Sequence, residues 1–224
     1  MGGPVGLFRE RRGSYFQAEN PLETRGDRRI VGDLLSPSRK PASIGGVPMR
    51  FYNRACVLVE NQYENLELWY PYWRLRELGL EVDLVGPEDE KVYGSKEGYS
   101  CTSDTPVVTA LERDYDVIVV PGGMAPDKLR RYPNILQLVK KVHDEGGIVA
   151  SICHGPWVLI SAKILRGRKA TCVSAIKDDV VNAGAEYHDV EVVVDRNIVT
   201  SRTPKDLAVW SSAIVKLLEA RGMK

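Results

Sequence analysis

The chain has 224 residues, with 31 Lys and Arg against 30 Asp and Glu, and 43% of its residues are hydrophobic. This composition is typical of a globular protein, and a domain of this length buries about 70% of its unfolded-state surface without disulfides or metal. The net charge of +1 and the short apolar runs give no reason to expect a nucleic-acid or membrane partner. Four scattered cysteines without a Cys-x-x-Cys pair argue against a zinc site and favour the cytoplasm.

Residues 1–50 differ from the rest. Residues 1–53 contain nine Lys or Arg and five Asp or Glu, a net charge of +4, without a sustained period of 2 or 3.6. We predict an irregular or disordered leader over 1–50, followed by one domain over 51–224. The leader lacks the apolar segment of a secretory signal, and its acidic residues argue against a transit peptide. A start at Met49 is the alternative interpretation.

From Arg54 onward, strand-like runs alternate with helical patterns. Strands are predicted at 55–59, 80–85, 116–120 and 148–152, a hairpin at 192–201, and helices over 64–79, around 135–142, from about 155 and over 207–221. The helix over 64–79 carries Leu66, Trp69 and Trp73 at nearly helical spacing. Such alternation predicts a parallel sheet with helices on both faces, and ligands bind beyond the carboxyl ends of its strands.

Cys153 directly follows the predicted strand 148–152, and Gly155-Pro156 begins a helix. This strand–turn–helix order is typical of a nucleophile elbow, where the helix end would lower the thiol pKa. A buried structural cysteine is the alternative. His154 is adjacent, but consecutive helical residues point about 100° apart, so its contact with the sulfur is not assured. The other three cysteines are predicted to be structural.

Two further strand ends carry candidate groups. Glu64 opens the first helix, where its carboxylate either caps the helix or reaches Cys153, and the spacing does not decide between these roles. Pro121-Gly122-Gly123 exposes backbone N–H groups that could bind an oxyanion, or forms a simple tight turn. The chain has no dinucleotide-binding, P-loop or metal-spaced motif, so we expect no cofactor and no metal.

In these motifs the chain resembles the ThiJ/PfpI superfamily, specifically its PfpI-type intracellular protease and deglycase branch. The resemblance runs from about Arg54 to about Leu218. Its markers are residues 61–68 with 70–72, 120–126, 149–156, 165–169, 176–179 with 182–184, 192–195 and 201–204. It implies a flavodoxin-like three-layer α/β sandwich with a mostly parallel sheet, as in class I glutamine amidotransferases.

The resemblance also implies roles for the candidate residues. Cys153 would be the nucleophile, Glu64 the glutamate that hydrogen-bonds its sulfur, and His154 the histidine of the protease branch. Gly123 and the backbone of His154 match the oxyanion hole, with Gly122 beside them.

Two positions depart from the family pattern. An acidic residue from a neighbouring subunit completes the family's site, and here its position holds Asp127, which is shorter than the family's Glu. Trp157 stands where a polar Gln is expected and would narrow the pocket. The family forms dimers that assemble as trimers of dimers, so we expect a homo-oligomer with a site shared between subunits.

The resemblance therefore implies a cytoplasmic cysteine hydrolase that acts as a peptidase, a deglycase or both on peptide or small carbonyl substrates. The alternatives are a cofactor-free glyoxalase and a non-catalytic redox-sensing or chaperone protein that uses the same cysteine. A glutamine amidotransferase is disfavoured, because Ile152 and His154 replace the usual glycine-flanked cysteine and no later His-x-Glu follows.

Overall fold

The computed structural model describes residues 43–44, 47–48, 51–88 and 91–223. Of the predicted leader, it describes the paired strands β1 (Ser43–Ile44) and β2 (Val47–Pro48); the other residues up to 50 lie outside the described part. No helix in the described residues has the length and apolar character needed to cross a membrane.

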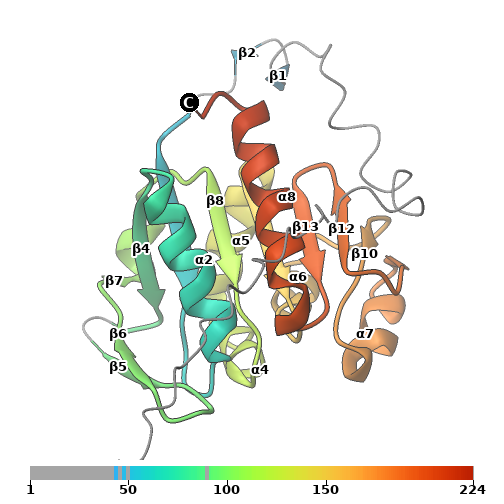
Figure 1. Cartoon of the computed structure of the whole chain (residues 1–224), viewed down its shortest axis with the longest axis horizontal. Coiled ribbons are helices and arrows are strands. Elements are labelled where there is room, and N and C mark those ends of the chain that lie inside the picture. The colour runs from blue at the N-terminus through green and yellow to red at the C-terminus, as the bar shows by residue number, and fades with distance from the viewer. Residues whose placement is uncertain (1–42, 45–46, 49–50, 89–90, 224) are drawn as a thin grey trace, which may run out of the picture.

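A seven-stranded sheet forms the centre of the domain, in the order β12-β13-β9-β8-β3-β4-β7 (Figure 1). Its strands are β3 (Arg54–Leu58), β4 (Glu81–Gly86), β7 (Thr105–Pro106), β8 (Val117–Val120), β9 (Ile148–Ile152), β12 (Val192–Asp195) and β13 (Ile198–Ser201). Every neighbouring pair is parallel except the β12–β13 hairpin. The apolar strands β8 and β9 are buried along their whole length, as expected for a sheet covered on both faces. The predicted α/β fold with a mostly parallel sheet is confirmed.

Helices cover both faces of this sheet. Helices α2 (Asn65–Glu77) and α8 (Leu207–Ala220) lie in front of it in Figure 1, and α5 (Pro133–Asp144) and α6 (Pro156–Ser161) lie behind. The shorter helices are α3 (Val107–Ala110), α4 (Ala125–Leu129), α7 (Lys177–Asn182), η2 (Ser174–Ile176) and η3 (Pro204–Asp206). Two small pairs complete the described elements: the hairpin β5 (Val92–Gly94) and β6 (Ser100–Thr102), and the parallel pair β10 (Lys169–Ala170) and β11 (Glu186–Tyr187).

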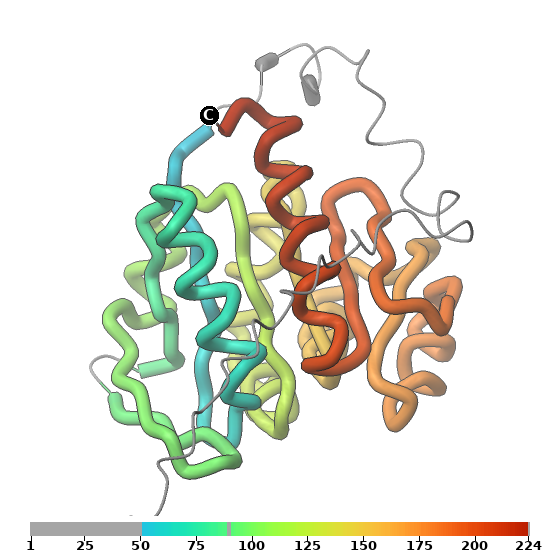
Figure 2. Tube along the Cα trace, viewed as in Figure 1, coloured from blue at the N-terminus to red at the C-terminus, as the bar shows by residue number. Residues whose placement is uncertain are grey.

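The parallel strands end at the lower edge of the sheet, where the loops after β3, β8 and β9 gather (Figure 2). The register keeps these ends level: Val57 pairs with Val119, and Val120 pairs with Ser151. Three chain segments that are far apart in sequence therefore meet at one place. This edge is where the predicted candidate residues come together.

Helix α2 decides which side chains reach that edge. Its apolar residues lie on two sides: Leu66 and Trp73 are 56% and 58% exposed, whereas Leu68 and Leu75 face the core. The spacing of Leu66, Trp69 and Trp73 thus predicts the helix correctly but does not mark its buried face. Glu67 is on that buried face, fully shielded from solvent beneath the sheet edge.

Candidate active site

Cys153 occupies a strained turn between β9 and α6. Its φ is +60°, in the left-handed region that residues other than glycine rarely adopt. The turn is fixed by backbone hydrogen bonds, because the N–H of Cys153 donates to Ser201 O at 3.1 Å and Val173 N–H donates to Cys153 O at 3.2 Å. Cys153 is half-buried, while the other three cysteines are buried. The structure therefore has the geometry of a nucleophile elbow, with strain stored at a candidate functional residue.

Glu67 supplies the carboxyl group beside the sulfur. Its carboxyl group influences the pKa of the Cys153 thiol and is influenced by it, its Oε2 accepts the N–H of Gly122 at 2.8 Å, and its Oε1 has no hydrogen-bond partner among the described residues. Burial first, and then the charge of Glu64, raise the pKa of Glu67 to about 8. At neutral pH the carboxyl is therefore largely protonated and can donate a hydrogen bond to the sulfur. Because the N–H of Gly122 donates to Glu67, it is not available to bind the oxyanion of a substrate.

Glu64, predicted as the partner of the sulfur, instead caps α2. Its Oε2 accepts the N–H of Glu67 at 2.7 Å from an extended N-cap conformation. The assignment to the sulfur is corrected to Glu67, and the capping alternative for Glu64 is confirmed. The two residues differ because Glu64 is the N-cap of α2, where its carboxylate turns back onto the first helical turn. Glu67, three positions later, lies on the side of the helix that faces the sheet.

The backbone N–H groups of Gly123 and His154 favour the ionised form of Cys153, because both oppose the rise of its pKa. Gly123 has a φ of +72°, and a Cβ on it would lie 2.3 Å from the carbonyl oxygen of Gln62. Only glycine fits there, because both the conformation and the close approach exclude a side chain. The loop after β8 thus presents a donor beside the nucleophile, within reach of a substrate carbonyl oxygen, on which negative charge develops when the sulfur attacks.

The thiol of Cys153 is protonated in the resting site. Burial first, and then the charge on Glu67, raise its pKa to about 12, while the N–H groups of Gly123 and His154 oppose this. The predicted lowering by the helix end is wrong for this site. Helix α6 has only six residues, and the loss of water around the sulfur outweighs the field at its N-terminus. Attack by the sulfur therefore requires a base.

His154 can be that base. Its Nδ1 lies 3.3 Å from Cys153 Sγ, so the contact that the sequence left open is present. Burial first, and then the positive charge of Lys96, lower the pKa of His154, so the ring is neutral at neutral pH. Lys96 was not predicted. It lies in the β5–β6 turn, where its N–H donates to Tyr63 O at 3.0 Å, and the only sequence signal is its place in a polar turn.

Asp127 does not reach His154 within the described part of this chain. Its carboxylate forms an ion pair with Arg131 one turn later, and Arg131 Nε also donates to its carbonyl oxygen at 3.1 Å. A role for Asp127 in the site of another subunit stays a prediction. Trp157, in contrast, lies against the site, with its ring centroid 5.1 Å from that of His154.

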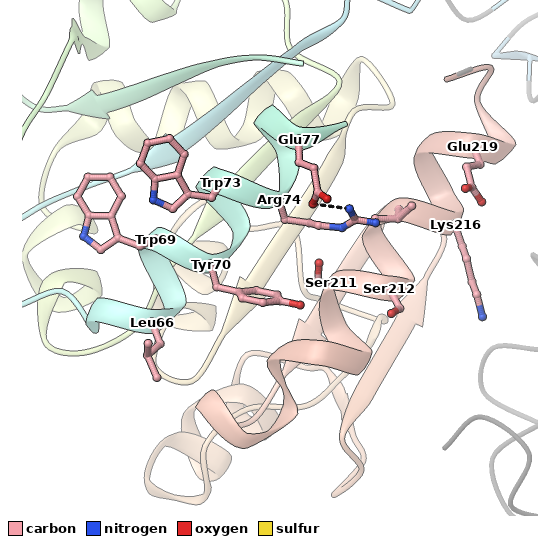
Figure 3. Close-up of a pocket in the computed structure, with 11 residues that line it drawn as sticks. Leu66, Trp69, Tyr70, Trp73, Arg74, Glu77, Ser211, Ser212, Lys216 and Glu219 are labelled. Carbon is pink, nitrogen blue, oxygen red and sulfur yellow. Dashed lines mark hydrogen bonds and ion pairs between the residues drawn. The ribbon is translucent and has the colours of Figure 1, made fainter. Parts of the chain in front are cut away.

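A separate groove of about 910 Å³ runs between α2 and α8 (Figure 3). Trp69, Tyr70 and Trp73 line one wall, and Ser211 and Lys216 are on the other side. The groove includes none of the groups that contact the Cys153 sulfur. The candidate catalytic groups therefore lie at the sheet edge and not in this groove.

Comparisons with known proteins identify the family of the chain. Residues 53–217 match the DJ-1/PfpI family. Deglycase PH1704 of Pyrococcus horikoshii is 47% identical over 162 residues, covering 72% of this chain and 97% of the relative. Protein/nucleic acid deglycase 2 of Escherichia coli is 38% identical over 169 residues, covering 75% and 98%. The crystal structure of Drosophila melanogaster DJ-1beta, 25% identical, superposes with a TM-score of 0.69 over 75% of this chain and 94% of that chain.

Proposed function

The chain belongs to the DJ-1/PfpI family, and from this premise we propose that it is a cysteine-dependent deglycase, which hydrolyses glyoxal and methylglyoxal adducts of amino groups and thiols. One observation carries the proposal. A protonated Cys153 thiol at a strained turn lies between a neutral imidazole and a protonated carboxyl group, with two backbone N–H groups that favour its ionised form. The names of the deglycase relatives support the choice of substrate.

The overall reaction needs only water as co-substrate. A methylglyoxal hemiaminal, R–NH–CH(OH)–CO–CH₃, plus H₂O gives R–NH₂ and lactic acid. The sulfur of Cys153 forms a bond to the carbinol carbon, and the C–N bond breaks. A proton then moves from the carbon that carries the sulfur to the neighbouring carbonyl carbon, which converts the enzyme-bound adduct into a thioester. Water hydrolyses the thioester and returns the thiol.

Residues around Cys153 supply the proton transfers that these reaction steps require. His154 Nδ1 accepts the thiol proton as the sulfur attacks, because it is neutral and 3.3 Å away. Glu67, protonated at neutral pH, donates a proton to the departing amine and then, as a carboxylate, accepts the carbon-bound proton. The Gly123 and His154 N–H groups stabilise the negative charge on the substrate oxygen.

The test compares three substrates side by side: a methylglyoxal-modified amine or thiol, free methylglyoxal, and a fluorogenic peptide. We expect release of the free amine and of lactate from the adduct, lost in Cys153→Ser. Turnover of free methylglyoxal alone would indicate a glyoxalase, and cleavage of the peptide alone would indicate a peptidase. No turnover of any substrate, with selective oxidation of Cys153 by peroxide, would favour the redox-sensing alternative and refute the proposal.

We further propose that Asp127 from a neighbouring copy orients His154, and that the protein acts as a homo-oligomer in the cytoplasm. Among the described residues of its own chain, the imidazole of His154 hydrogen-bonds only the sulfur, so it lacks an orienting carboxylate. Mixing inactive Cys153→Ser with Asp127→Ala subunits should restore part of the activity, because mixed interfaces pair an intact Cys153 with an intact Asp127. Full activity of Asp127→Ala alone would refute the shared site.

A further inference from the structure

Trp157 lies one helical turn after His154 and packs against its ring. The ring centroids are 5.1 Å apart with an interplanar angle of 59°, and the N–H of Trp157 donates to the carbonyl oxygen of His154 at 3.1 Å. His154 lies in the turn before α6 and Trp157 in its first turn, so the indole lies beside the imidazole rather than merely near it in sequence. The contact links Trp157 directly to the proposed base.

The indole is itself fixed from two other helices. Its Nε1 donates to Asp179 Oδ2 on α7 at 2.8 Å. The guanidinium carbon of Arg130, at the end of α4, lies 5.6 Å from the indole centroid, and Arg130 Nε donates to Ser161 Oγ on α6 at 2.9 Å. Arg130 at the end of α4 and Asp179 on α7 thus contact the indole directly, and Ser161 on α6 holds Arg130 in place.

We propose that Trp157 is a positioning residue: held by Asp179 and Arg130, the indole keeps the imidazole of His154 beside the Cys153 thiol. The side chain of His154 has two rotatable bonds, and only the contact with the sulfur is hydrogen-bonded among the described residues. A fixed ring against the imidazole removes the alternative orientations that would carry Nδ1 away from the sulfur. This inference rests on the proposed function, because it assumes that the Cys153–His154 pair performs the proton transfer.

The geometry also indicates why Trp157 acts through its ring and not as a proton donor. The indole Nε1–H of Trp157 donates to Asp179 and is therefore not available to His154. The imidazole contacts only the aromatic ring of the indole. An aromatic contact of this kind changes a rate by up to about tenfold when it is lost. Replacement by phenylalanine keeps a ring at this position, whereas glutamine removes it.

The test uses Trp157→Gln, Trp157→Phe and Asp179→Asn, the last of which keeps an acceptor oxygen for the indole. We expect Trp157→Gln to lower kcat about tenfold for the methylglyoxal adduct with little change in KM, and Trp157→Phe to retain most of kcat. Asp179→Asn should resemble wild type. An altered KM with unchanged kcat in Trp157→Gln would overturn the proposal, since the ring would then border the substrate instead of positioning the base.

A second readout needs no substrate. The chain has only three histidines, so the His154 ring can be assigned by NMR through its loss in His154→Gln. Burial lowers the pKa of His154, and removal of the covering indole should raise it toward the ordinary value in Trp157→Gln but not in Trp157→Phe. Unchanged imidazole signals in Trp157→Gln would overturn the inference. If wild-type protein turns over no adduct, the proposed function fails, while this measurement still decides whether Trp157 positions His154.

Discussion

Replacement of Glu67 by glutamine tests whether Glu67, and not Glu64, is the catalytic acidic residue at the start of α2. Glu67→Gln keeps the shape of the side chain but removes its exchangeable proton, so turnover of the adduct should fall by roughly 10²–10⁴-fold, the range for loss of a general acid or base. Glu64→Gln is the matched control. Its amide oxygen can still accept the N–H of residue 67, so the helix cap survives and turnover should stay close to that of wild type.

The same substitution should change how stability and activity depend on pH. The pKa of Glu67 is raised from 4.5 to about 8, which corresponds to a change in the free energy of unfolding on the order of 5 kcal/mol across this pH range. Between these two values the folded protein binds more protons than the unfolded chain. Its free energy of unfolding should therefore fall as pH rises from 4.5 to 8, and Glu67→Gln should lack that decrease.

Urea unfolding at pH 5 and pH 9 measures this slope, and turnover across the same range measures the catalytic role. In wild type, activity should decline above about pH 8, where Glu67 loses its proton. On the acid side it should decline once His154 becomes protonated, below the ordinary histidine value because burial lowers that pKa. Near wild-type turnover in Glu67→Gln together with a large loss in Glu64→Gln would show that the assignment of these two residues is wrong.

Three other outcomes follow from the same structure. Iodoacetamide should modify Cys153 before the other cysteines, as mapped by mass spectrometry, because it alone of the four is not buried; equal labelling would contradict this. Gly123→Ala should abolish turnover, because its Cβ would clash with the Gln62 carbonyl oxygen. Gly167 has nearly the same positive φ but no atom within 4 Å of an added Cβ, so Gly167→Ala should keep turnover and show only the cost of backbone strain in thermal unfolding. Leu138→Ala should lower the free energy of unfolding by about 2–5 kcal/mol, whereas Leu66→Ala at an exposed position should have little effect.

The parts of the fold that could be predicted are those whose signal is contiguous. The buried strand β8 is an unbroken apolar run, β9 is apolar except for Ser151, and α5 buries Ile135, Leu138 and Val142 at the predicted spacing. The hairpin β5–β6 was missed, because strands of three residues with a polar turn carry no usable period. Lys96 was missed with it, since its relation to His154 depends on that turn folding over the sheet edge.

The site was predicted where its geometry is local and misassigned where it depends on packing. The elbow at Cys153 can be predicted because its signal lies in consecutive residues: a strand, then Cys153, His154 and Gly155, and then a helix. The choice between Glu64 and Glu67 depends on which side of α2 faces the sheet, and α2 has apolar side chains on both sides. Hydrophobic periodicity cannot resolve a helix of this kind, so only the packed structure identifies Glu67.

Burial explains both the error about the thiol and the chemistry that replaces it. A helix end acting alone would favour a thiolate, but the same lack of water that raises the pKa of Cys153 also raises that of Glu67 and lowers that of His154. All three groups are therefore uncharged in the resting site. None of the three then carries a buried charge in the resting site, and charge appears on His154 only when it accepts the thiol proton as the sulfur attacks. On this argument, the packing of α2 against the sheet edge sets the reactivity of Cys153 more than the helix that follows it.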